Sequence, residues 1–403
     1  MKQKRILILF PSALVPAIMM SQKRTIEQIL ALKKDHQVGV LCICRTAEEA
    51  IESEEFFKLH NLRFHQVLSA PKSKLLHTLL SLWYLFKFYF FAQRIEYQKN
   101  ASSNVTRKIL QIIECNYDIV ISHFWFGSAF MKQLNNTIKM IDAHGLVEEF
   151  IELNDNQQFL TNRPKHERRV LKNNLKYQKN IHQNSDYLIL NSIKSFNIAR
   201  QNYPGIKTYY CPNGQNLNYF FSFPKTSYEQ DTILFYGSYS GTQNIIALEL
   251  FYKNVWRIIV QENPMAKLLV VGNKPPQWIR DLSKNNNIEV TGFVEDVRAQ
   301  IQRAACMVIP MTVGVGFRGR IVEVMAMGVP IIGNHNALDC IGLDHGINGY
   351  VTDDYNTMAD EALKLMSDQQ YRTIISNNTL EFVSKNYSIE ATFGKLSVMI
   401  EEF

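Results

Sequence analysis

Short apolar runs separated by helical patterns constrain the fold of this chain more than any other feature. In the first half such runs occur at Arg5–Phe10, Gln37–Cys44, Tyr117–Ile121, Ile138–Ile141 and Tyr187–Asn191. A helical pattern over Gln22–Lys34 separates the first two runs. Strands that alternate with helices in this way are typical of a doubly wound parallel sheet.

The alternation stops and then starts again in the second half. Cys211–Gly214 (CPNG) is a turn signal, and Asn216–Asp231 is polar and aromatic with little periodicity. The apolar runs resume at Thr232–Tyr236, Lys267–Val271, Ile288–Val290, Met307–Ile309 and Pro330–Ile332. A length of 403 residues suggests two domains of roughly 150 residues or more. We therefore predict two doubly wound α/β domains that face each other across a cleft, where ligands usually bind.

Composition narrows the classes to which the chain can belong. Hydrophobic residues make up 46% and charged residues 20%, which excludes a disordered chain and indicates substantial cores. The six cysteines lack the spacing of a zinc site, and no Asp-x-Asp motif stands at a predicted strand end, so we expect reduced cysteines and no metal. The apolar run Ile6–Phe10 ends at Pro11 and is too short for a secretion signal, so we expect a cytoplasmic protein.

Leu75–Phe91 (LLHTLLSLWYLFKFYFF) is rich in leucine and aromatic residues and has basic flanks. At 17 residues, with His77 and Lys87 inside it, the stretch is a poor transmembrane span. It is either a buried helix or a helix that lies in the interface of an anionic membrane. The net charge of +7 fits several anionic partners. Outside this stretch there is no basic stripe with interleaved aromatic residues, so we do not expect nucleic acid as a partner.

Pro310–Pro330 (PMTVGVGFRGRIVEVMAMGVP) carries the clearest chemical signal. Its glycines, which let backbone approach a ligand closely, are Gly314, Gly316 and Gly319. Arg318 and Arg320 come where a helix should begin, and a helix N-terminus with two guanidinium groups favours a phosphate. Glu323, about one helical turn later, is suited to accept hydrogen bonds from ribose hydroxyls. The segment therefore indicates a site for a sugar nucleotide.

Simpler interpretations of these residues remain open. Two glycines can form an ordinary strand-to-helix turn, and two arginines on a helix can simply be solvated. Their combination with Glu323 and the helix-ending segment Met327–Pro330 is much rarer.

This combination resembles the donor-site motif of the retaining glycosyltransferases with the GT-B fold. Within that family it is similar to the group 1 branch that reads G-G-G-T-R-x-K-x-x-E-A-M-A-x-G-x-P-V. The matching residues are Gly314, Gly316, Arg318, Glu323, Met325, Ala326, Gly328 and Pro330. Arg320 stands where that branch has lysine.

Other segments match the family's pattern in the same order along the chain. They are Asp118–Trp125, Asp142–His144, Pro212–Gly214, Phe235–Ser238, Gln243–Asn244, Leu268–Gly272 and Thr291–Asp296. The resemblance implies that Gly272 and Val294 border the nucleotide, and that His144 faces the transferred sugar with Asp142 orienting it. His123 is either an acceptor-side residue or a structural histidine at a strand end.

The resemblance also implies three parts of the chain. Residues 1–217 would form an acceptor-side domain, residues 218–385 a donor-binding domain, and residues 386–403 a helix that packs back on the first domain. Two departures from the family bear on the site. Ser238 and Gln243 stand where the wider family has cations for the diphosphate, and the loop Pro11–Ser21 lacks the usual glycine pair. We therefore expect Arg318 and Arg320 to supply the cationic contacts.

In function, the resemblance implies transfer of a sugar from a UDP or GDP type donor to a hydroxyl of a saccharide or lipid-linked acceptor. Retention of configuration would follow. The aromatic stretch and the net positive charge indicate a lipid-linked saccharide as the acceptor, as in bacterial surface-glycan assembly. His144, Arg318 and Arg320 are the expected catalytic residues, which position the substrate and stabilise charge on the departing nucleotide. No cofactor is expected, and a lipid-linked acceptor would suit a peripheral position at the inner membrane face. The alternative is an inactive binding or scaffold protein, since a fold does not fix an activity.

Overall fold

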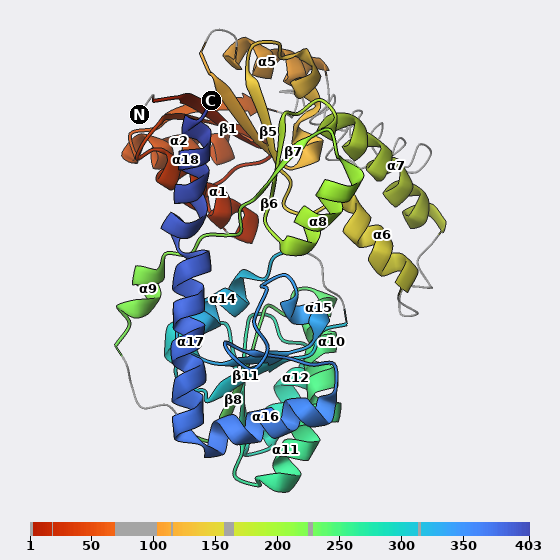
Figure 1. The fold of residues 1–403 in the computed structure, drawn as a ribbon, viewed down its shortest axis with the longest axis vertical. Coiled ribbons are helices and arrows are strands. Elements are labelled where there is room, and N and C mark those ends of the chain that lie inside the picture. Colours follow the sequence, from red (N-terminus) through yellow and green to blue (C-terminus); the bar gives the residue numbers. More distant parts are fainter. Residues whose placement is uncertain are drawn as a thin grey trace. The chain divides into compact units, whose positions relative to one another are not determined.

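The computed structural model describes residues 3–17, 19–68, 103–113, 116–156, 165–224, 229–312 and 316–403 (Figure 1). Leu75–Phe91 and Gly314, both singled out in the sequence, lie outside the described residues. The chain divides into two compact units. The first comprises Met1–Gly214 and Thr392–Phe403, and the second comprises Gln215–Ala391.

The described part of the first unit contains a seven-stranded sheet in the order β3-β2-β1-β4-β5-β6-β7, with every pair parallel. The strands are β1 (Arg5–Phe10), β2 (Gln37–Cys44), β3 (Arg63–Leu68), β4 (Ile119–His123), β5 (Ile138–Asp142), β6 (Tyr187–Leu190) and β7 (Lys207–Tyr210). The helices are α1 (Met20–Leu32), α2 (Ala47–Leu59), α5 (Ser103–Ile113), η1 (Trp125–Gly127), η2 (Ala129–Gln133), α6 (Val147–Asn156), α7 (Lys165–His182), α8 (Ile193–Asn202) and α18 (Lys395–Glu401).

Strand β1 illustrates why the central strands were predictable. Its residues from Ile6 to Phe10 are all at most 1% exposed. Leu7 and Leu9 belong to the core that includes side chains of α5. Ile8 points to the opposite face, because successive side chains of a strand alternate between the two faces. A strand that is covered on both faces needs a continuous apolar run. The predicted bounds of β1 and β2 are confirmed.

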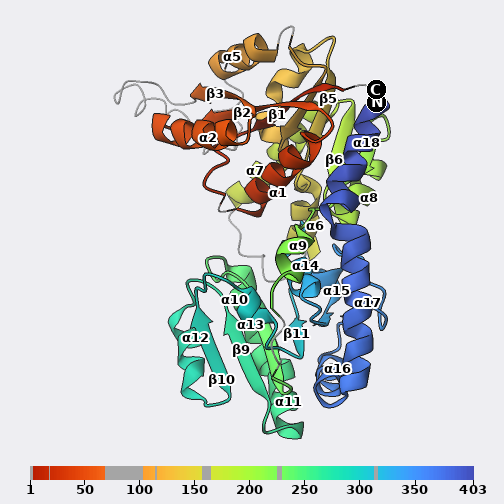
Figure 2. The ribbon, with the colours of Figure 1, turned by 90° about the vertical axis from the view of Figure 1, so that its left-hand side faces the viewer.

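The described part of the second unit contains a six-stranded parallel sheet in the order β10-β9-β8-β11-β12-β13. The strands are β8 (Thr232–Tyr236), β9 (Lys267–Val271), β10 (Ile288–Gly292), β11 (Cys306–Ile309), β12 (Ile331–Gly333) and β13 (Tyr350–Val351). The helices are α9 (Leu217–Phe221), α10 (Thr242–Leu250), η4 (Phe251–Trp256), α11 (Arg257–Glu262), α12 (Gln277–Asp281), η5 (Leu282–Lys284), α13 (Arg298–Ile301), α14 (Gly319–Ala326), α15 (His335–Leu338), α16 (Tyr355–Ser367) and α17 (Gln369–Tyr387). Helix α16 packs on β11 and β12, and α17 packs on α14 and α16 (Figure 2).

The predicted fold class of two doubly wound parallel sheets is confirmed. In each sheet the chain order reverses beside the first strand, between β1 and β4 in one unit and between β8 and β11 in the other. Ligands of such sheets bind at the carboxyl ends of the strands near this switch point. The fold thus directs attention to the carboxyl ends of β1, β4, β8 and β11, and of the neighbouring strands β5 and β9.

The strands β3, β7 and β13 were not predicted, and all three stand at the edge of a sheet. An edge strand is covered less completely than a central one, so its sequence can be polar. Strand β3 reads RFHQVL and β7 reads KTYY, and most of their residues are exposed or half-buried.

The C-terminal residues pass from the second unit to the first through the turn η6 (Glu390–Gly394). Helix α18 then lies against α1. Leu396 and Ile400 are fully buried there, and the Ser397 hydroxyl donates a hydrogen bond to Asp35 Oδ2 at 2.8 Å. The last helix is therefore part of the first unit's core.

Candidate functional site

Two glycines bring the carboxyl ends of β8 and β9 into close contact in the second unit. Gly237 follows β8, and Gly272 follows β9 with a positive φ of 153°. A Cβ atom on Gly272 would lie 1.8 Å from the carbonyl oxygen of Gly237. No other residue fits at position 272 without a backbone shift. The two strand ends therefore present a surface of bare backbone, here called the glycine surface.

Helix α14 places Arg320 against the glycine surface. The helix begins at Gly319 with Arg318 as its N-cap residue, where the sequence predicted a helix start. A Cβ atom on Gly237 would lie 3.0 Å from Nη1 of Arg320. The Nε of Arg320 is buried, and no described residue accepts a hydrogen bond from it. A buried donor without an acceptor is costly and is often associated with a functional role.

The surroundings of Arg320 disfavour its charge when no anion is bound. Burial lowers the pKa of Arg320 to about 10, and the charge of Arg318 adds to this effect. Tyr236, Tyr239 and Glu323 act in the opposite direction. The Tyr236 hydroxyl donates a hydrogen bond to Glu323 Oε2 at 3.2 Å, whereas the buried Tyr239 hydroxyl has no hydrogen-bond partner among the described residues. A guanidinium and a phenol are thus both buried without full hydrogen bonding.

Arg318 has a different environment. Its Nε lies 2.9 Å from Sδ of Met311, and its Nη1 lies 3.8 Å from Sγ of Cys340. The side chain is buried, and these two contacts are both with sulfur atoms. Arg320, by contrast, contacts the glycine surface through its Nη1.

The other predicted donor-site residues have varied positions. The Ser238 hydroxyl donates to Asn273 Oδ1 at 2.6 Å beside the glycine surface. Gln243 is exposed in the first turn of α10, and Val294 is half-buried against the core. Gly316 has a positive φ of 67°. The structure therefore gathers Ser238, Gly272, Arg320 and Glu323 around the ends of β8 and β9.

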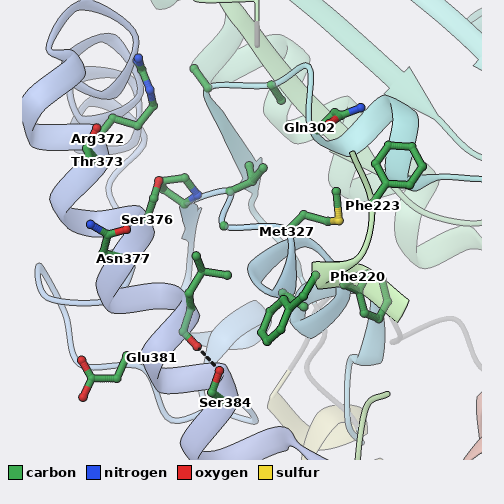
Figure 3. Close-up of a pocket in the computed structure, with 18 of the residues that line it drawn as sticks. Phe220, Phe223, Gln302, Met327, Arg372, Thr373, Ser376, Asn377, Glu381 and Ser384 are labelled. Carbon is green, nitrogen blue, oxygen red and sulfur yellow. Dashed lines mark hydrogen bonds between the residues drawn. The ribbon is translucent and has the colours of Figure 1, made fainter. Parts of the chain in front are cut away.

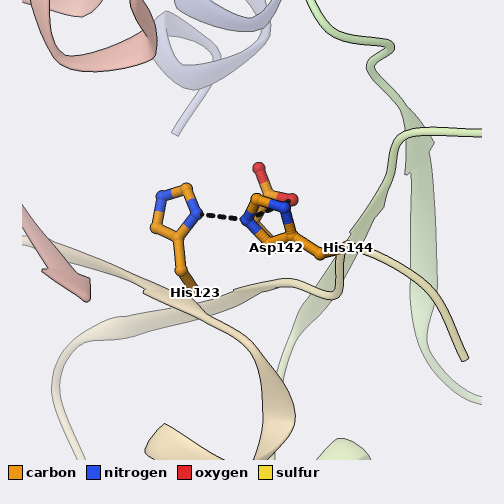
Figure 4. A group of neighbouring side chains, drawn as sticks. All are labelled: His123, Asp142 and His144. Atoms are coloured by element: carbon orange, nitrogen blue, oxygen red, sulfur yellow. Dashed lines mark hydrogen bonds and ion pairs between the residues drawn. The ribbon is translucent and has the colours of Figure 1, made fainter. Parts of the chain in front are cut away.

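In the first unit, His123, Asp142 and His144 lie together at the carboxyl ends of two neighbouring strands (Figure 4). His123 ends β4, and Asp142 ends β5. His144 has a positive φ of 56°, a conformation that is uncommon outside glycine and is enriched at functional sites. Nε2 of His144 lies 2.7 Å from Nδ1 of His123 and 3.7 Å from Oδ1 of Asp142.

A fully buried ion pair anchors this group. The side chains of Arg24, on α1, and Asp142 are both 0% exposed. Nη2 of Arg24 donates to Oδ2 of Asp142 at 2.8 Å, and its Nη1 donates to the carbonyl oxygen of Pro212 at 2.8 Å. Burial alone would raise the pKa of Asp142, but Arg24 and the two histidines hold it at about 2. Asp142 is therefore ionised at neutral pH.

His123, Asp142 and His144 include donor atoms close enough to share a metal ion. Their environment favours a hydrogen-bond network instead. Burial lowers the pKa of His123 to about 3 and that of His144 to about 4, so both rings are neutral at pH 7. Arg24 already neutralises Asp142 and would repel a cation. The contact of 2.7 Å between the two rings has the length of a strong hydrogen bond and uses the lone pair that a metal would need.

Residues 230–368 in the second unit match the model of the family described as Glycosyl transferases group 1. The second unit therefore carries the domain of a glycosyltransferase. No curated protein matches the chain.

Solved structures similar to the glycosyltransferase share its fold along the whole chain. Sucrose-phosphate synthase from Thermosynechococcus elongatus has a TM-score of 0.67 at 14% identity, with 100% of this chain and 99% of that chain covered. HepE from Anabaena in complex with UDP-glucose has a TM-score of 0.64 at 15% identity, with 100% of both chains covered. WaaG, a glycosyltransferase involved in lipopolysaccharide biosynthesis, has a TM-score of 0.62 at 12% identity, with 98% of this chain and 99% of that chain covered. These likenesses assign the GT-B fold to the glycosyltransferase.

Sequence reasoning missed the residues of α1 that support the histidines. Arg24, Thr25 and Gln28 are all at most 2% exposed and contact Asp142 or His123. Positions three and four apart on a helix share a face. The polar residues on one face of α1 are therefore the sequence signal that could have identified this support.

None of the described helices has the length and apolar character needed to span a bilayer.

A cavity of about 630 Å³ in the second unit is separate from the glycine surface (Figure 3). Its walls include Ala305, which precedes β11, Pro330, which precedes β12, and residues of α17 such as Arg372 and Ser376. It therefore lies at the amino ends of these strands, whereas ligands of doubly wound sheets bind at the carboxyl ends. We do not assign the donor to this cavity.

Proposed function

We propose that the glycosyltransferase takes its sugar from a nucleoside diphosphate sugar whose diphosphate binds Arg320 at the glycine surface. The observation that carries this proposal is the buried guanidinium of Arg320, set against bare backbone with its Nε unpaired among the described residues. Phosphate oxygens would accept charge-assisted hydrogen bonds from it. Glycine at positions 237 and 272 permits close approach.

Further residues of the second unit are proposed for other parts of the donor. Glu323 would accept hydrogen bonds from ribose hydroxyls, and Val294 would border the base. Gly314, Gly316 and Arg318 would line the phosphate side, with Ser238 and Gln243 as neutral neighbours. HepE from Anabaena has been solved with UDP-glucose, which supports a UDP sugar as the first donor to test.

For the chemistry we propose transfer with retention. The acceptor oxygen forms a bond to the anomeric carbon from the face that the diphosphate leaves, and the departing phosphate oxygen takes the acceptor's proton. Arg320, with Arg318, would stabilise the negative charge on that phosphate. In the first unit, His144 would bind a hydroxyl of the sugar or acceptor, with His123 and Asp142 holding it in place.

The proposed acceptor is a saccharide or a lipid-linked saccharide in surface-glycan assembly. Support comes from WaaG, a glycosyltransferase involved in lipopolysaccharide biosynthesis, and from the aromatic sequence Leu75–Phe91 with its basic flanks. We further propose a cytoplasmic protein that works peripherally at the inner membrane face, with the aromatic sequence and its basic flanks as the support.

Ligand-dependent melting followed by turnover tests the proposal. UDP, GDP, ADP and their sugars are added to the full chain, and the cognate nucleotide should stabilise it by about 2.7 kcal/mol at 100 times its Kd. The donor so identified is then incubated with saccharides and membrane extracts. Release of free nucleotide that depends on an acceptor is expected. Binding without release across all donors and acceptors would contradict transfer and support the scaffold alternative.

A methyl group on Gly237 is expected to weaken nucleotide binding by about tenfold, the size of one impaired charged hydrogen bond. The added Cβ of Gly237→Ala would lie 2.9 Å from Asn244 Nδ2 and 3.0 Å from Arg320 Nη1, so the guanidinium must move. Calorimetric titration with the cognate nucleotide measures the change. Gly241→Ala is the matched control, because nothing lies within 4 Å of its Cβ. Equal affinities of the two variants would contradict a binding role for the glycine surface.

A further inference from the structure

We propose that Gln28 fixes the ring tautomers of His123 and His144, so that Nδ1 of His144 is a hydrogen-bond acceptor for a hydroxyl of the ligand. Gln28 is thereby a positioning residue that acts through two histidines. The part of this inference that concerns a ligand rests on the proposed function, whereas the tautomers themselves do not.

The first step is the orientation of the Gln28 amide. Its Nε2 lies 3.1 Å from Oδ2 of Asp142. Asp142 is paired with Arg24 and ionised, so its oxygens can only accept hydrogen bonds. A reversed amide would place its oxygen against a buried carboxylate, which is repulsive. The NH2 group of Gln28 therefore faces Asp142, and its Oε1 faces His123.

The second step is the tautomer of His123. Its Nε2 lies 3.0 Å from Oε1 of Gln28, which is an acceptor, so Nε2 carries the hydrogen. The ring is neutral, and Nδ1 consequently has a lone pair. The Thr25 hydroxyl lies 3.1 Å from this Nδ1, but it donates its one hydrogen to the carbonyl oxygen of Ser21 at 2.8 Å. The lone pair of His123 is thus available to another donor.

The third step is the tautomer of His144, which follows from that of His123. Its Nε2 lies 2.7 Å from the lone pair of His123 Nδ1, and two lone pairs would repel at that distance, so Nε2 of His144 carries the hydrogen. Oδ1 of Asp142, 3.7 Å from the same nitrogen, favours the same tautomer. Nδ1 of His144 is left as an acceptor, and no described residue donates to it. Phe124 stacks on the ring with centroids 4.3 Å apart, which holds its plane.

This arrangement selects the chemical class of the group that His144 recognises. An acceptor nitrogen requires a ligand atom that brings a hydrogen, such as a sugar hydroxyl. A carboxylate at the same place would set a lone pair against a lone pair. We therefore expect a neutral hydroxylated sugar or acceptor to be preferred over its deoxy and carboxylate analogues at the position that meets His144.

Nitrogen-15 NMR of histidine-labelled full-length protein tests the tautomers without substrate. In the wild type, Nε2 of both His123 and His144 should show a directly bound proton and Nδ1 should not, with signals assigned through His123→Asn and His144→Asn. In Gln28→Met the Nδ1–H tautomer should appear at His123 or His144, and kcat/KM should fall about tenfold, as for one misplaced hydrogen bond. A wild type with Nδ1–H at His144 would overturn the inference.

Gln178→Met is the matched control, because Gln178 is also 0% exposed in the same unit but bonds Glu148 and the backbone of Val147. It should lower stability without changing either tautomer. If Gln28→Met folds poorly, the wild-type spectra still decide the order of hydrogens, because Nδ1–H at His123 or at His144 would contradict it. Unchanged tautomers in Gln28→Met, or altered ones in Gln178→Met, would refute the role of Gln28. Correct tautomers without any turnover would instead count against the proposed function alone.

Discussion

Replacing Arg320 with methionine is expected to lower kcat/KM for the donor by at least about 100-fold. The substitution removes the guanidinium that we assign to the diphosphate, and each charged hydrogen bond contributes about 1.5–3 kcal/mol. Two such bonds correspond to a factor of about 100 or more, at about 1.4 kcal/mol for each tenfold change. Steady-state kinetics and calorimetry with the nucleotide measure the loss.

The same variant is expected to be no less stable than the wild type when no nucleotide is bound. Burial lowers the pKa of Arg320 from 12.5 to about 10, which corresponds to a cost of about 3 kcal/mol for holding the charge in the folded state. This cost is fully present below pH 10 and disappears as the pH rises toward 12.5. Arg280→Met on the exposed face of α12 is the control for lost charge and should change neither property. A large fall in the melting temperature of the unliganded Arg320→Met protein would show that Arg320 is a structural residue.

Replacing Arg24 with methionine should have the largest effect on stability. The variant leaves the carboxylate of Asp142 buried without its cation, and breaking a buried ion pair in this way costs about 3–5 kcal/mol. For a unit of this size the melting temperature should fall by roughly 6–20 °C. Thermal unfolding followed by circular dichroism measures it. Arg5→Met is the matched control, because Arg5 and Asp118 form an exposed pair in the same sheet, and exposed ion pairs contribute little to stability.

The pH dependence distinguishes a lost ion pair from lost packing. In the wild type the folded-state pKa of Asp142 is about 2, below its ordinary value of 3.8. Its contribution to stability is therefore present above pH 3.8 and is lost as the pH falls toward 2. In Arg24→Met burial should raise that pKa instead, so protonation of Asp142 should relieve the variant. The stability difference between the two proteins should shrink on acidification below pH 5. A constant difference would indicate that Arg24 acts only through packing.

The elements that could be predicted are those whose burial requires a particular pattern in a short stretch of consecutive residues. Central strands such as β1 and β8 are covered on both faces and need continuous apolar sequence. The edge strands β3, β7 and β13 carry no such requirement and were missed.

The candidate site likewise has residues that could be predicted from the sequence and residues that could not. Gly316, Arg318, Arg320 and Glu323 stand within one short segment, and their spacing alone indicated a sugar-nucleotide site. The support of His144 depends on Arg24 and Gln28, which are more than a hundred residues away from Asp142 along the chain. Only the folded sheet brings these residues together. A sequence can suggest that a polar face of α1 is buried, but it does not show which carboxylate that face meets.

The second unit is inserted into the first, and the place of insertion has a consequence for engineering. The first unit stops at Gly214 and resumes at Thr392, and a Cβ on Gly214 would lie 2.5 Å from Oγ1 of Thr392. At the other side of the junction, the backbone N–H of Gln215 donates to the carbonyl oxygen of Tyr387 at 2.8 Å. In each unit, therefore, the residues on the two sides of the junction lie next to each other. Inserted domains with this arrangement can be removed or exchanged. A donor-binding unit from another enzyme of this fold could be grafted between Gly214 and Thr392 without lengthening either connection.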